Sequence, residues 1–209
     1  MKFYTVKTPS IIQRIFSRYT WRFSTSQKEI YLTFDDGPTS EITNFILSEL
    51  KKYQAKATFF CIGKNVKNHP SIYQQIIKDG HSVGNHTFHH LKGPKTKNAT
   101  YIDDTKHASA HIHSPLFRPP YGKIKASQGK LLKQSGYQII MWDVLSGDFD
   151  LSITPEKCLK NVLKNTNKGS IVVMHDSKKA KEKIYYALPK ILPYFIEKGF
   201  QFKAIPYLK

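Results

Sequence analysis

Residues 32–39 read LTFDDGPT, in which an apolar run meets two neighbouring carboxylates, Asp35 and Asp36, and then the pair Gly37-Pro38. Neighbouring residues on a β-strand point to opposite faces. Both aspartates can therefore serve one site only if the chain bends there, and a Gly-Pro pair is a typical turn sequence. This stretch predicts a functional site at the end of a strand.

Short apolar, β-branched or aromatic runs recur along the 209 residues and predict strands. They lie at 29–34, 56–62, 81–85, 116–120, 137–144 and 170–175. Segments with helical spacing lie between them, at 39–54, 69–80, 129–136 and 154–165. This alternation is typical of parallel βα units. About six or seven such units predict an α/β single domain with a closed or nearly closed barrel, and an open doubly wound sheet is the alternative.

Local signals predict where several helices begin and end. Thr39 or Ser40 is expected to cap the helix that follows the aspartates. Glycine is the residue expected just after a helix C-terminus. The glycines that predict such ends are Gly80, Gly136, Gly169 and Gly199.

Residues 1–28 precede the first predicted strand and are expected to form an extension that packs on the barrel, with the catalytic domain at 29–209. Within the extension, residues 10–22 have the pattern of a short basic amphipathic helix. A helix that caps one end of the barrel is the preferred interpretation, because surface helices of globular proteins commonly carry an apolar stripe. A role at a membrane surface is the alternative.

The chain carries 33 Lys+Arg against 15 Asp+Glu, a formal charge of +18. This charge favours anionic partners. Lysine dominates the cations, whereas readers of bases and phosphates favour the bidentate fork of arginine, so no specific nucleic-acid partner is expected. The sequence shows no apolar stretch of signal-peptide length and no transmembrane segment, so a cytoplasmic location is expected, with the cell surface or periplasm left open.

The stretch GNHTFHH at 84–90 contains a pair of candidate metal ligands, His86 and His90. A helix that begins at Asn85 or Thr87 would place the two imidazoles on one face, four residues apart. Two histidines and one carboxylate make a ligand set with an open position, the arrangement of a catalytic zinc. Together with an aspartate of the DD pair at the same rim of a barrel, these residues predict a metal site.

Two further residues complete the candidate site. Arg118, in FRPPYG, is the one arginine after residue 22, and a guanidinium beside a carboxylate keeps it ionised and oriented. His175 ends the very apolar run IVVMH. A partly desolvated histidine at a strand end is suited to general acid catalysis, and a buried histidine of purely structural role is the alternative.

Five motifs in order, TFDDGP, HTFHH, RPPYG, WDVLSGDF and VMHD, resemble those of the NodB-homology polysaccharide deacetylases, which are metal-dependent carbohydrate esterases. The resemblance spans about residues 29–207, most of the chain. It implies a distorted (β/α) barrel of about seven parallel strands. It also implies removal of acetyl groups from N- or O-acetylated carbohydrate, above all from glycans that contain N-acetylglucosamine.

The resemblance implies a role for each residue of these motifs. Asp35 is expected to be the catalytic base, oriented by Arg118, and His175 the general acid, tuned by Asp148 directly or through Arg118. The expected ligands of one divalent metal ion, Zn²⁺ before Co²⁺, Ni²⁺ or Mn²⁺, are Asp36, His86 and His90. The expected substrate-binding residues are Pro120, Tyr121, whose backbone N–H would stabilise the oxyanion, Trp142 and Val173.

The fourth motif departs from the family pattern, because Leu145 stands where many members have aspartate and Phe149 where they have tryptophan. This difference affects the substrate groove more than the chemistry. The alternatives are a carbohydrate-binding protein with a degenerate site and a deacylase of a non-carbohydrate amide. The expected partner is an acetylated glycan or oligosaccharide, and the expected oligomeric state is a monomer.

Overall fold

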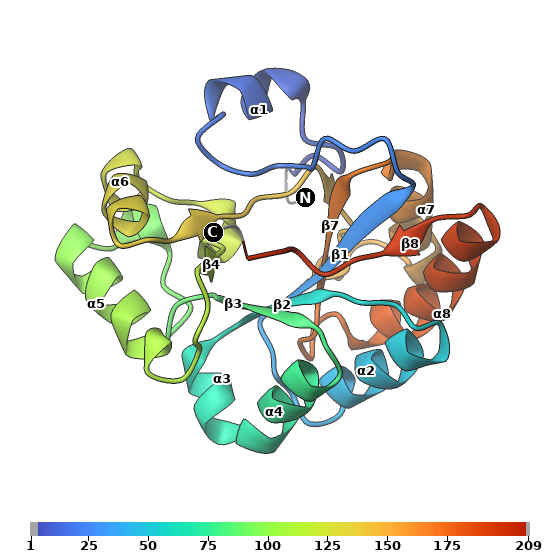
Figure 1. Cartoon of the computed structure of the whole chain (residues 1–209), viewed down its shortest axis with the longest axis horizontal. Coiled ribbons are helices and arrows are strands. Elements are labelled where there is room, and N and C mark those ends of the chain that lie inside the picture. Colours follow the sequence, from blue (N-terminus) through green and yellow to red (C-terminus); the bar gives the residue numbers. More distant parts are fainter. Residues whose placement is uncertain (1–3, 208–209) are drawn as a thin grey trace.

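The strands of the chain form one parallel sheet that curls into a half-barrel (Figure 1). The computed structural model describes residues 4–207. Seven strands follow one another in the order β5-β4-β3-β2-β1-β7-β6, and β8 pairs with β1 beside this path. The strands are β1 (Glu29–Asp35), β2 (Thr58–Cys61), β3 (Ser82–Asn85), β4 (Leu116–Phe117), β5 (Gln138–Ile139), β6 (Val144–Leu145), β7 (Ser170–His175) and β8 (Gln201–Phe202). The expected α/β single-domain fold with about seven parallel strands is confirmed.

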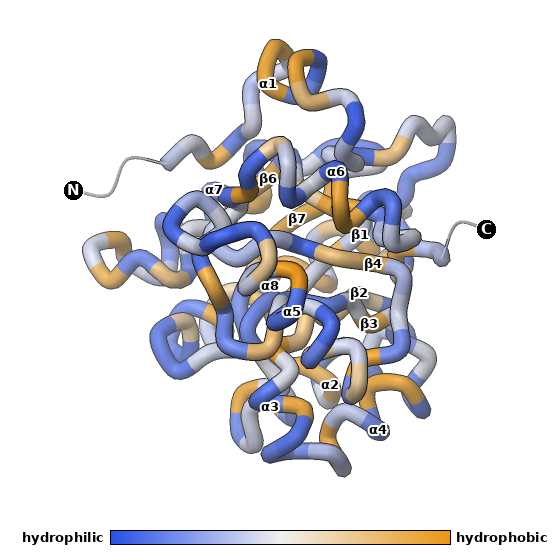
Figure 2. Tube along the Cα trace, turned by 90° about the vertical axis from the view of Figure 1, so that its left-hand side faces the viewer, coloured by the Kyte–Doolittle hydropathy of each residue, from blue (hydrophilic) through white to orange (hydrophobic). Residues whose placement is uncertain are grey.

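Helices cover the outer face of the curled sheet (Figure 1). They are α2 (Ile42–Lys52), α3 (Gly63–Asn68), α4 (Pro70–Lys78), α5 (Asn98–Ser109), α6 (Ala126–Gln134), α7 (Pro155–Asn165) and α8 (Lys181–Glu197). Helix α1 (Ser10–Ile15) lies apart from them at the top of Figure 1, and η1 (Gly93–Lys95) and η2 (Pro120–Gly122) are short 3₁₀ turns. The largest hydrophobic cluster lies between these helices and the sheet, and apolar residues concentrate there in Figure 2.

Alternate residues of β1 and β7 point to the two faces of the sheet. Leu32 and Phe34 of β1 join the cluster under the helices. Thr33 and Asp35 therefore face the inside of the curl. Their register partners on β7 are Val173 and His175, so Asp35 and His175 emerge side by side at the carboxyl ends of two neighbouring strands.

Gly199 predicts the end of helix α8, but no range was predicted for the helix itself, and Pro189 and Pro193 lie inside it. Proline removes a backbone donor and discourages a helix interior. The apolar side chains of α8 are nevertheless buried against the sheet. This tertiary packing outweighs the local preference.

The predicted strand at 137–144 is wrong in the middle, where the structure has two short strands, β5 and β6. The carbonyls of Ile140 and Met141 accept hydrogen bonds from the guanidinium of Arg118. The Arg118 side chain thus binds the two carbonyls that a neighbouring strand would otherwise bind, and the strand is interrupted there.

Two predicted helix signals are also wrong. Helix α2 begins after Glu41 without a side-chain cap, and the Thr39 hydroxyl donates to the carbonyl of Asp176 instead. Gly169 lies directly before β7, since α7 already ends at Asn165. The other three glycines follow α4, α6 and α8 with positive φ, as predicted.

The segment before β1 contacts the sheet through three isolated bridges. Lys7 pairs with Val144, Thr20 with Ile140 and Arg22 with Ser170. The Lys7 ammonium also forms an ion pair with buried Asp143, at 2.7 Å. The division of the chain into an extension and a catalytic domain after residue 28 stays a prediction.

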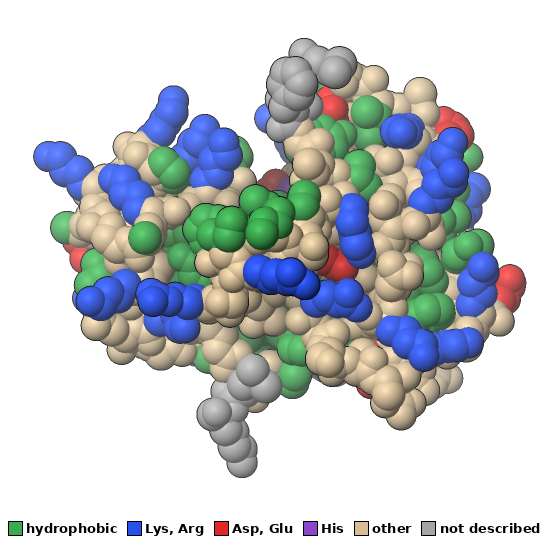
Figure 3. Space-filling model, turned by 90° about the horizontal axis from the view of Figure 1, so that it is seen from above, with side chains coloured by type: hydrophobic (Ala, Val, Ile, Leu, Met, Phe, Trp, Pro, Cys, Tyr) green, Lys and Arg blue, Asp and Glu red, His purple; other side chains and the backbone are tan. Residues whose placement is uncertain are grey.

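Helix α1 is shorter than the predicted helix at 10–22, and none of its residues is buried. The interpretation of its apolar stripe as a packed cap is therefore wrong. Lys and Arg side chains are spread widely over the face of the molecule that Figure 3 shows. Among residues 4–207, no helix is long and apolar enough to span a membrane.

Two isoleucines test whether the core under the helices holds the fold. Ile46 in α2 is fully buried, whereas Ile77 in α4 is 43% exposed. We expect Ile46→Ala to lower the free energy of unfolding by about 2–5 kcal/mol, because it removes buried methyl groups and leaves a cavity. Ile77→Ala should change it by less than about 0.5 kcal/mol. Equal effects of the two substitutions in urea unfolding would contradict this core.

Candidate active site

The chain bends at Asp36, directly after β1. Asp36 has φ 85°, the left-handed region that side-chain-bearing residues rarely adopt. Its backbone is held by Asn65, whose side-chain amide donates to the Asp36 carbonyl at 2.6 Å. The bend lets the neighbouring carboxylates of Asp35 and Asp36 serve one site, as the sequence predicts, although it begins one residue before the Gly37-Pro38 pair.

A buried carboxylate, Asp176, packs against the inside of this bend. It accepts hydrogen bonds from the Gly37 N–H at 2.7 Å and from the Thr43 hydroxyl at 2.6 Å. A Cβ at Gly37 would overlap this carboxylate, so the position requires glycine. Burial raises the pKa of Asp176 to about 7, although the two hydrogen bonds oppose the shift.

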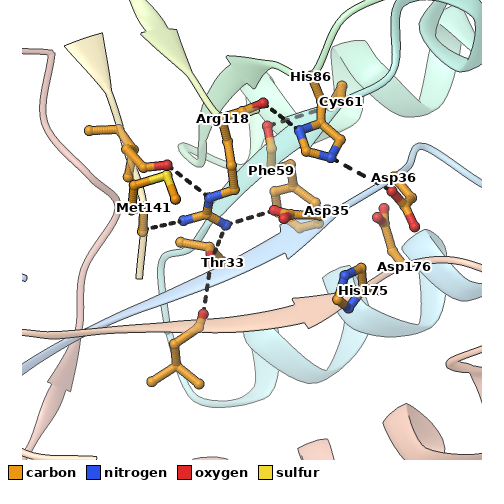
Figure 4. Close-up of polar contacts among 12 residues, drawn as sticks. Thr33, Asp35, Asp36, Phe59, Cys61, His86, Arg118, Met141, His175 and Asp176 are labelled. Atoms are coloured by element: carbon orange, nitrogen blue, oxygen red, sulfur yellow. Dashed lines mark hydrogen bonds and ion pairs between the residues drawn. The ribbon is translucent and has the colours of Figure 1, made fainter. Parts of the chain in front are cut away.

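The side chain of Arg118 is fully buried and reaches across the inside of the curled sheet (Figure 4). One guanidinium nitrogen donates to Asp35 Oδ1 at 2.7 Å and to the Thr33 hydroxyl at 2.7 Å. The guanidinium also lies 4.0 Å from the centre of the Phe60 ring. Burial lowers the pKa of Arg118, and the attraction of Asp35 opposes that shift. The Arg118–Asp35 pair expected from the sequence is thus formed.

The predicted metal ligands converge on one point. Oxygen or nitrogen atoms of Asp36, His86 and His90 all lie within 4.8 Å of one another. His90 Nε2 is 3.2 Å and His86 Nε2 3.8 Å from Asp36 Oδ1. Among the residues that the structure describes, this is the one group of three or more such side chains close enough to share an ion.

The helix proposed to align the two histidines is absent. Residues 86–90 form a loop after β3, in which Thr87 and His90 have φ 62° and 58°. Asn85 accepts a hydrogen bond from the Thr87 N–H, and Asp104 of α5 accepts from the N–H groups of Phe88 and His89. These buried side chains fold the loop so that both imidazoles point to Asp36.

The protonation of His86 fits a metal ligand. Its Nδ1 lies 2.7 Å from the Arg118 carbonyl, which can only accept, so Nδ1 carries the hydrogen and Nε2 offers a lone pair. Burial lowers the pKa of His86 to about 3, so the ring is neutral in neutral solution. Metal-bound histidines typically donate their second N–H to such a carbonyl. The donor set therefore fits a divalent ion of borderline softness such as zinc.

Asp148 contacts His175 directly, which decides between the two routes left open by the sequence. Its carboxylate lies 2.7 Å from His175 Nδ1 and accepts the His175 backbone N–H at 2.6 Å. Burial alone would lower the pKa of His175, but the charge and hydrogen bond of Asp148, followed by the charges of Asp36 and Asp35, raise it to about 10. His175 is therefore an imidazolium at neutral pH.

The residues expected to bind substrate lie at different depths. Tyr121 is 58% exposed, with φ 61°, and its ring centre lies 4.6 Å from that of His90. Trp142 is half-buried and packs on Gly122, where a Cβ would overlap its ring. Pro120 and Val173 are buried. Tyr121 and Trp142 thus flank the site at its rim, and the binding roles of all four stay predictions.

The sequence reasoning missed several residues that build the site. Asp176 and Thr43 hold the bend, Thr33 shares the Arg118 guanidinium, and Asp104 holds the ligand loop. Asp176 directly follows His175 in the VMHD motif, a signal that could have drawn attention to it. Asp104 had no such signal, because its partners lie 15 and 16 residues away on a loop.

Comparison with known proteins identifies relatives with the same architecture. The polysaccharide deacetylase family profile matches residues 23–140. A peptidoglycan-N-acetylglucosamine deacetylase of Bacillus cereus is 35% identical over 90% of this chain and 92% of its own length. A chitooligosaccharide deacetylase of Azorhizobium caulinodans is 30% identical over 88% of this chain and 96% of its own. The crystal structure of a peptidoglycan N-acetylglucosamine deacetylase superposes with a TM-score of 0.83, at 32% identity, over 90% of this chain and 91% of that one.

The pair of His175 and Asp148 makes a prediction about proton affinity. In Asp148→Asn, the pKa of His175 should fall well below about 10, since burial still lowers it while the charge of Asp148 is lost and only Asp36 and Asp35 still raise it. An NMR titration of the His175 ring measures this change, and exposed Asp103→Asn is the matched control.

The same shift links stability to pH. Because the folded-state pKa of His175 is raised, the stabilisation by Asp148 is fully present below about pH 6.5 and is lost as the pH rises through about 10. The difference in unfolding free energy between wild type and Asp148→Asn should therefore shrink across this window. A difference that grows with pH, or an unchanged pKa of His175, would contradict the pairing.

Proposed function

Because this chain belongs to the polysaccharide deacetylase family and is therefore a carbohydrate deacetylase, we propose that it hydrolyses the acetamide of N-acetylglucosamine residues in a glycan. One observation carries the proposal. Asp35, paired with Arg118, and His175, paired with Asp148, stand at the ends of neighbouring strands, and Asp36 of the candidate metal site directly follows Asp35. Amide hydrolysis needs a base, an acid and an electrophilic centre close together, and these candidates all lie at the carboxyl ends of the strands.

Asp35 acts as the base in this proposal. Arg118 and Thr33 fix its position, since both the Thr33 hydroxyl and Asp35 Oδ1 bond to the same guanidinium nitrogen. The Asp35 side chain is 5% exposed, which leaves little competition from bulk water. Asp35 would take a proton from the water that attacks the acetyl carbonyl carbon.

Asp36, His86 and His90 would hold a divalent metal ion, proposed as Zn²⁺ with Co²⁺, Ni²⁺ or Mn²⁺ as substitutes. When bound, such an ion polarises a carbonyl oxygen and acidifies water. Three protein ligands leave a coordination position open, which distinguishes catalytic from structural sites. The Tyr121 backbone N–H would add a donor for the developing oxyanion, an interaction worth about 3–4 kcal/mol in comparable sites.

His175 acts as the acid. Its pKa of about 10 keeps it protonated at neutral pH, and Asp148 holds Nδ1, so Nε2 carries the proton that faces the site. It would donate this proton to the leaving nitrogen as the C–N bond breaks. The products are acetate and a free amine on the sugar.

Peptidoglycan-like or chitin-like glycans are the proposed substrates, because the relatives named above act on peptidoglycan and chitooligosaccharide. Two alternatives remain to be separated. A carbohydrate-binding protein with a degenerate site predicts glycan binding without acetate release. A deacylase of other amides predicts release from a simple acetamide but not from N-acetylglucosamine oligomers.

Acetate release from N-acetylglucosamine oligomers, acetylated xylan and a simple acetamide tests the proposal. We expect metal-stripped protein to be inactive and regain activity with Zn²⁺ or Co²⁺. Asp35→Asn should lower kcat by roughly 100- to 10,000-fold while metal binding is kept, since the base is lost and the ligands are not. Asp103→Asn, an exposed neutralisation of the same size, should leave kcat unchanged. Full activity of Asp35→Asn would remove Asp35 as the base.

His86→Ala tests the metal site independently of turnover. We expect this variant to lose at least about tenfold in affinity for Zn²⁺ by titration calorimetry, because one of three ligands is gone. His113→Ala removes an exposed histidine and is the matched control. Equal Zn²⁺ affinity of the two variants would place the ion elsewhere.

A further inference from the structure

Helix α1 and Phe16, which directly follows it, expose large apolar side chains to solvent. Ile11, Ile15 and Phe16 are 57%, 64% and 48% exposed, and Ile12 is 36% exposed. Residues 11, 12, 15 and 16 are spaced one, three and four apart and so lie on one side of the helix. We define these four residues as the apolar ridge. Isolated exposed apolar residues are ordinary, but a cluster of large aliphatic and aromatic side chains marks an interaction site.

The structure holds α1 with this ridge turned outward. Gln13 donates from its side-chain amide to the Thr8 carbonyl at 3.1 Å, and the Trp21 indole N–H donates to the Phe16 carbonyl at 2.9 Å. Phe16 and Tyr19 stack with interplanar angle 8°. Both hydrogen bonds end on backbone carbonyls and leave the apolar side chains uncovered. Helix α1 protrudes at the top of the molecule in Figures 1 and 2.

Cations dominate the segments around the ridge, and the nearby carboxylate of Asp143 is buried and paired with Lys7. Residues 1–28 contain no Asp or Glu, and neither do residues 105–142, which include α6. The two segments touch, because Lys133 of α6 donates to the Arg18 carbonyl and Thr20 bridges to Ile140. Arg14 and Arg18 of the first segment and Lys130 and Lys133 of the second are all exposed. Figure 3 shows hydrophobic side chains on this face with Lys and Arg side chains next to them.

We propose that the apolar ridge and its flanking cations dock this chain onto an anionic lipid bilayer. Aliphatic side chains enter the boundary between headgroups and acyl chains, while Arg14, Arg18 and the lysines of α6 contact the lipid phosphates. Tyr19 and Trp21 have the amphipathic rings that favour this interface. The inference does not depend on the proposed function.

Two other occupants of the ridge fit less well. A second copy of the chain would bring together two faces rich in lysine and arginine, each on a molecule of formal charge +18, and like charges repel. A soluble anionic polymer could form ion pairs with the cations, but it offers no apolar surface to bury the exposed isoleucines. A bilayer with anionic headgroups is the partner that uses both features.

The test is co-sedimentation of the full chain with vesicles of phosphatidylcholine and phosphatidylglycerol, in about a three-to-one mixture, beside vesicles of phosphatidylcholine alone. We expect binding to the anionic vesicles that weakens as salt rises from about 0.1 to about 1 M, where screening shortens from about 10 to about 3 Å.

Matched variants separate insertion from simple charge attraction. Ile15→Ser should lower partitioning by roughly tenfold, whereas Ile77→Ser, at a 43% exposed position of α4, should not. Arg14→Gln with Arg18→Gln should also lower it by roughly tenfold or more, unlike the exposed pair Lys51→Gln with Lys67→Gln. All variants should keep the wild-type circular dichroism and melting temperature, because the positions are exposed.

Three results would overturn the proposal. One is the absence of binding to anionic vesicles. Another is a loss of vesicle binding in the Arg14→Gln, Arg18→Gln variant while Ile15→Ser binds fully, which would mean that charge attraction alone holds the chain on the vesicles. The third is a concentration-dependent dimer in light scattering that Ile15→Ser abolishes, which would assign the ridge to a second copy.

Discussion

The buried guanidinium of Arg118 is the constraint on which the site depends. A charge taken out of water is tolerated only with complete pairing. Arg118 therefore collects Asp35, the Thr33 hydroxyl and the carbonyls of Ile140 and Met141. The same residue uses its backbone carbonyl to fix the His86 tautomer. One residue thus ties the candidate base, a candidate metal ligand and the end of β5 into a single arrangement.

Parallel pairing of β1 with β7 does the rest of the positioning. Because the register matches Asp35 with His175, the proposed base and the proposed acid emerge at the same height from neighbouring strands. Asp148 then raises the proton affinity of His175, while burial lowers that of His86. Two histidines in one site are thereby given opposite protonation states, and such divergence is the expected mark of acid and ligand roles.

The bend after β1 shows how local strain is held in place from a distance. Asp36 keeps its left-handed conformation because Asn65 holds its carbonyl and Asp176 holds the next N–H. Neither partner is near in sequence to the aspartates. Strained residues at functional sites persist only where surrounding structure fixes them, and here that structure comes from α3 and the end of β7.

The sequence by itself determined the strand and helix alternation, the basic character and the main candidate residues of the site, because residue types and motif order carry that chemistry. It did not determine the loop that joins His86 to His90, the helix α8 with its two prolines, or the outward ridge of α1. These features depend on partners far away in the chain: Asp104 for the loop, the sheet for α8, and the placement of residues 7–22 against β5 to β7 for α1. Periodicity reports which side of an element is apolar, and only tertiary packing decides whether that side is covered.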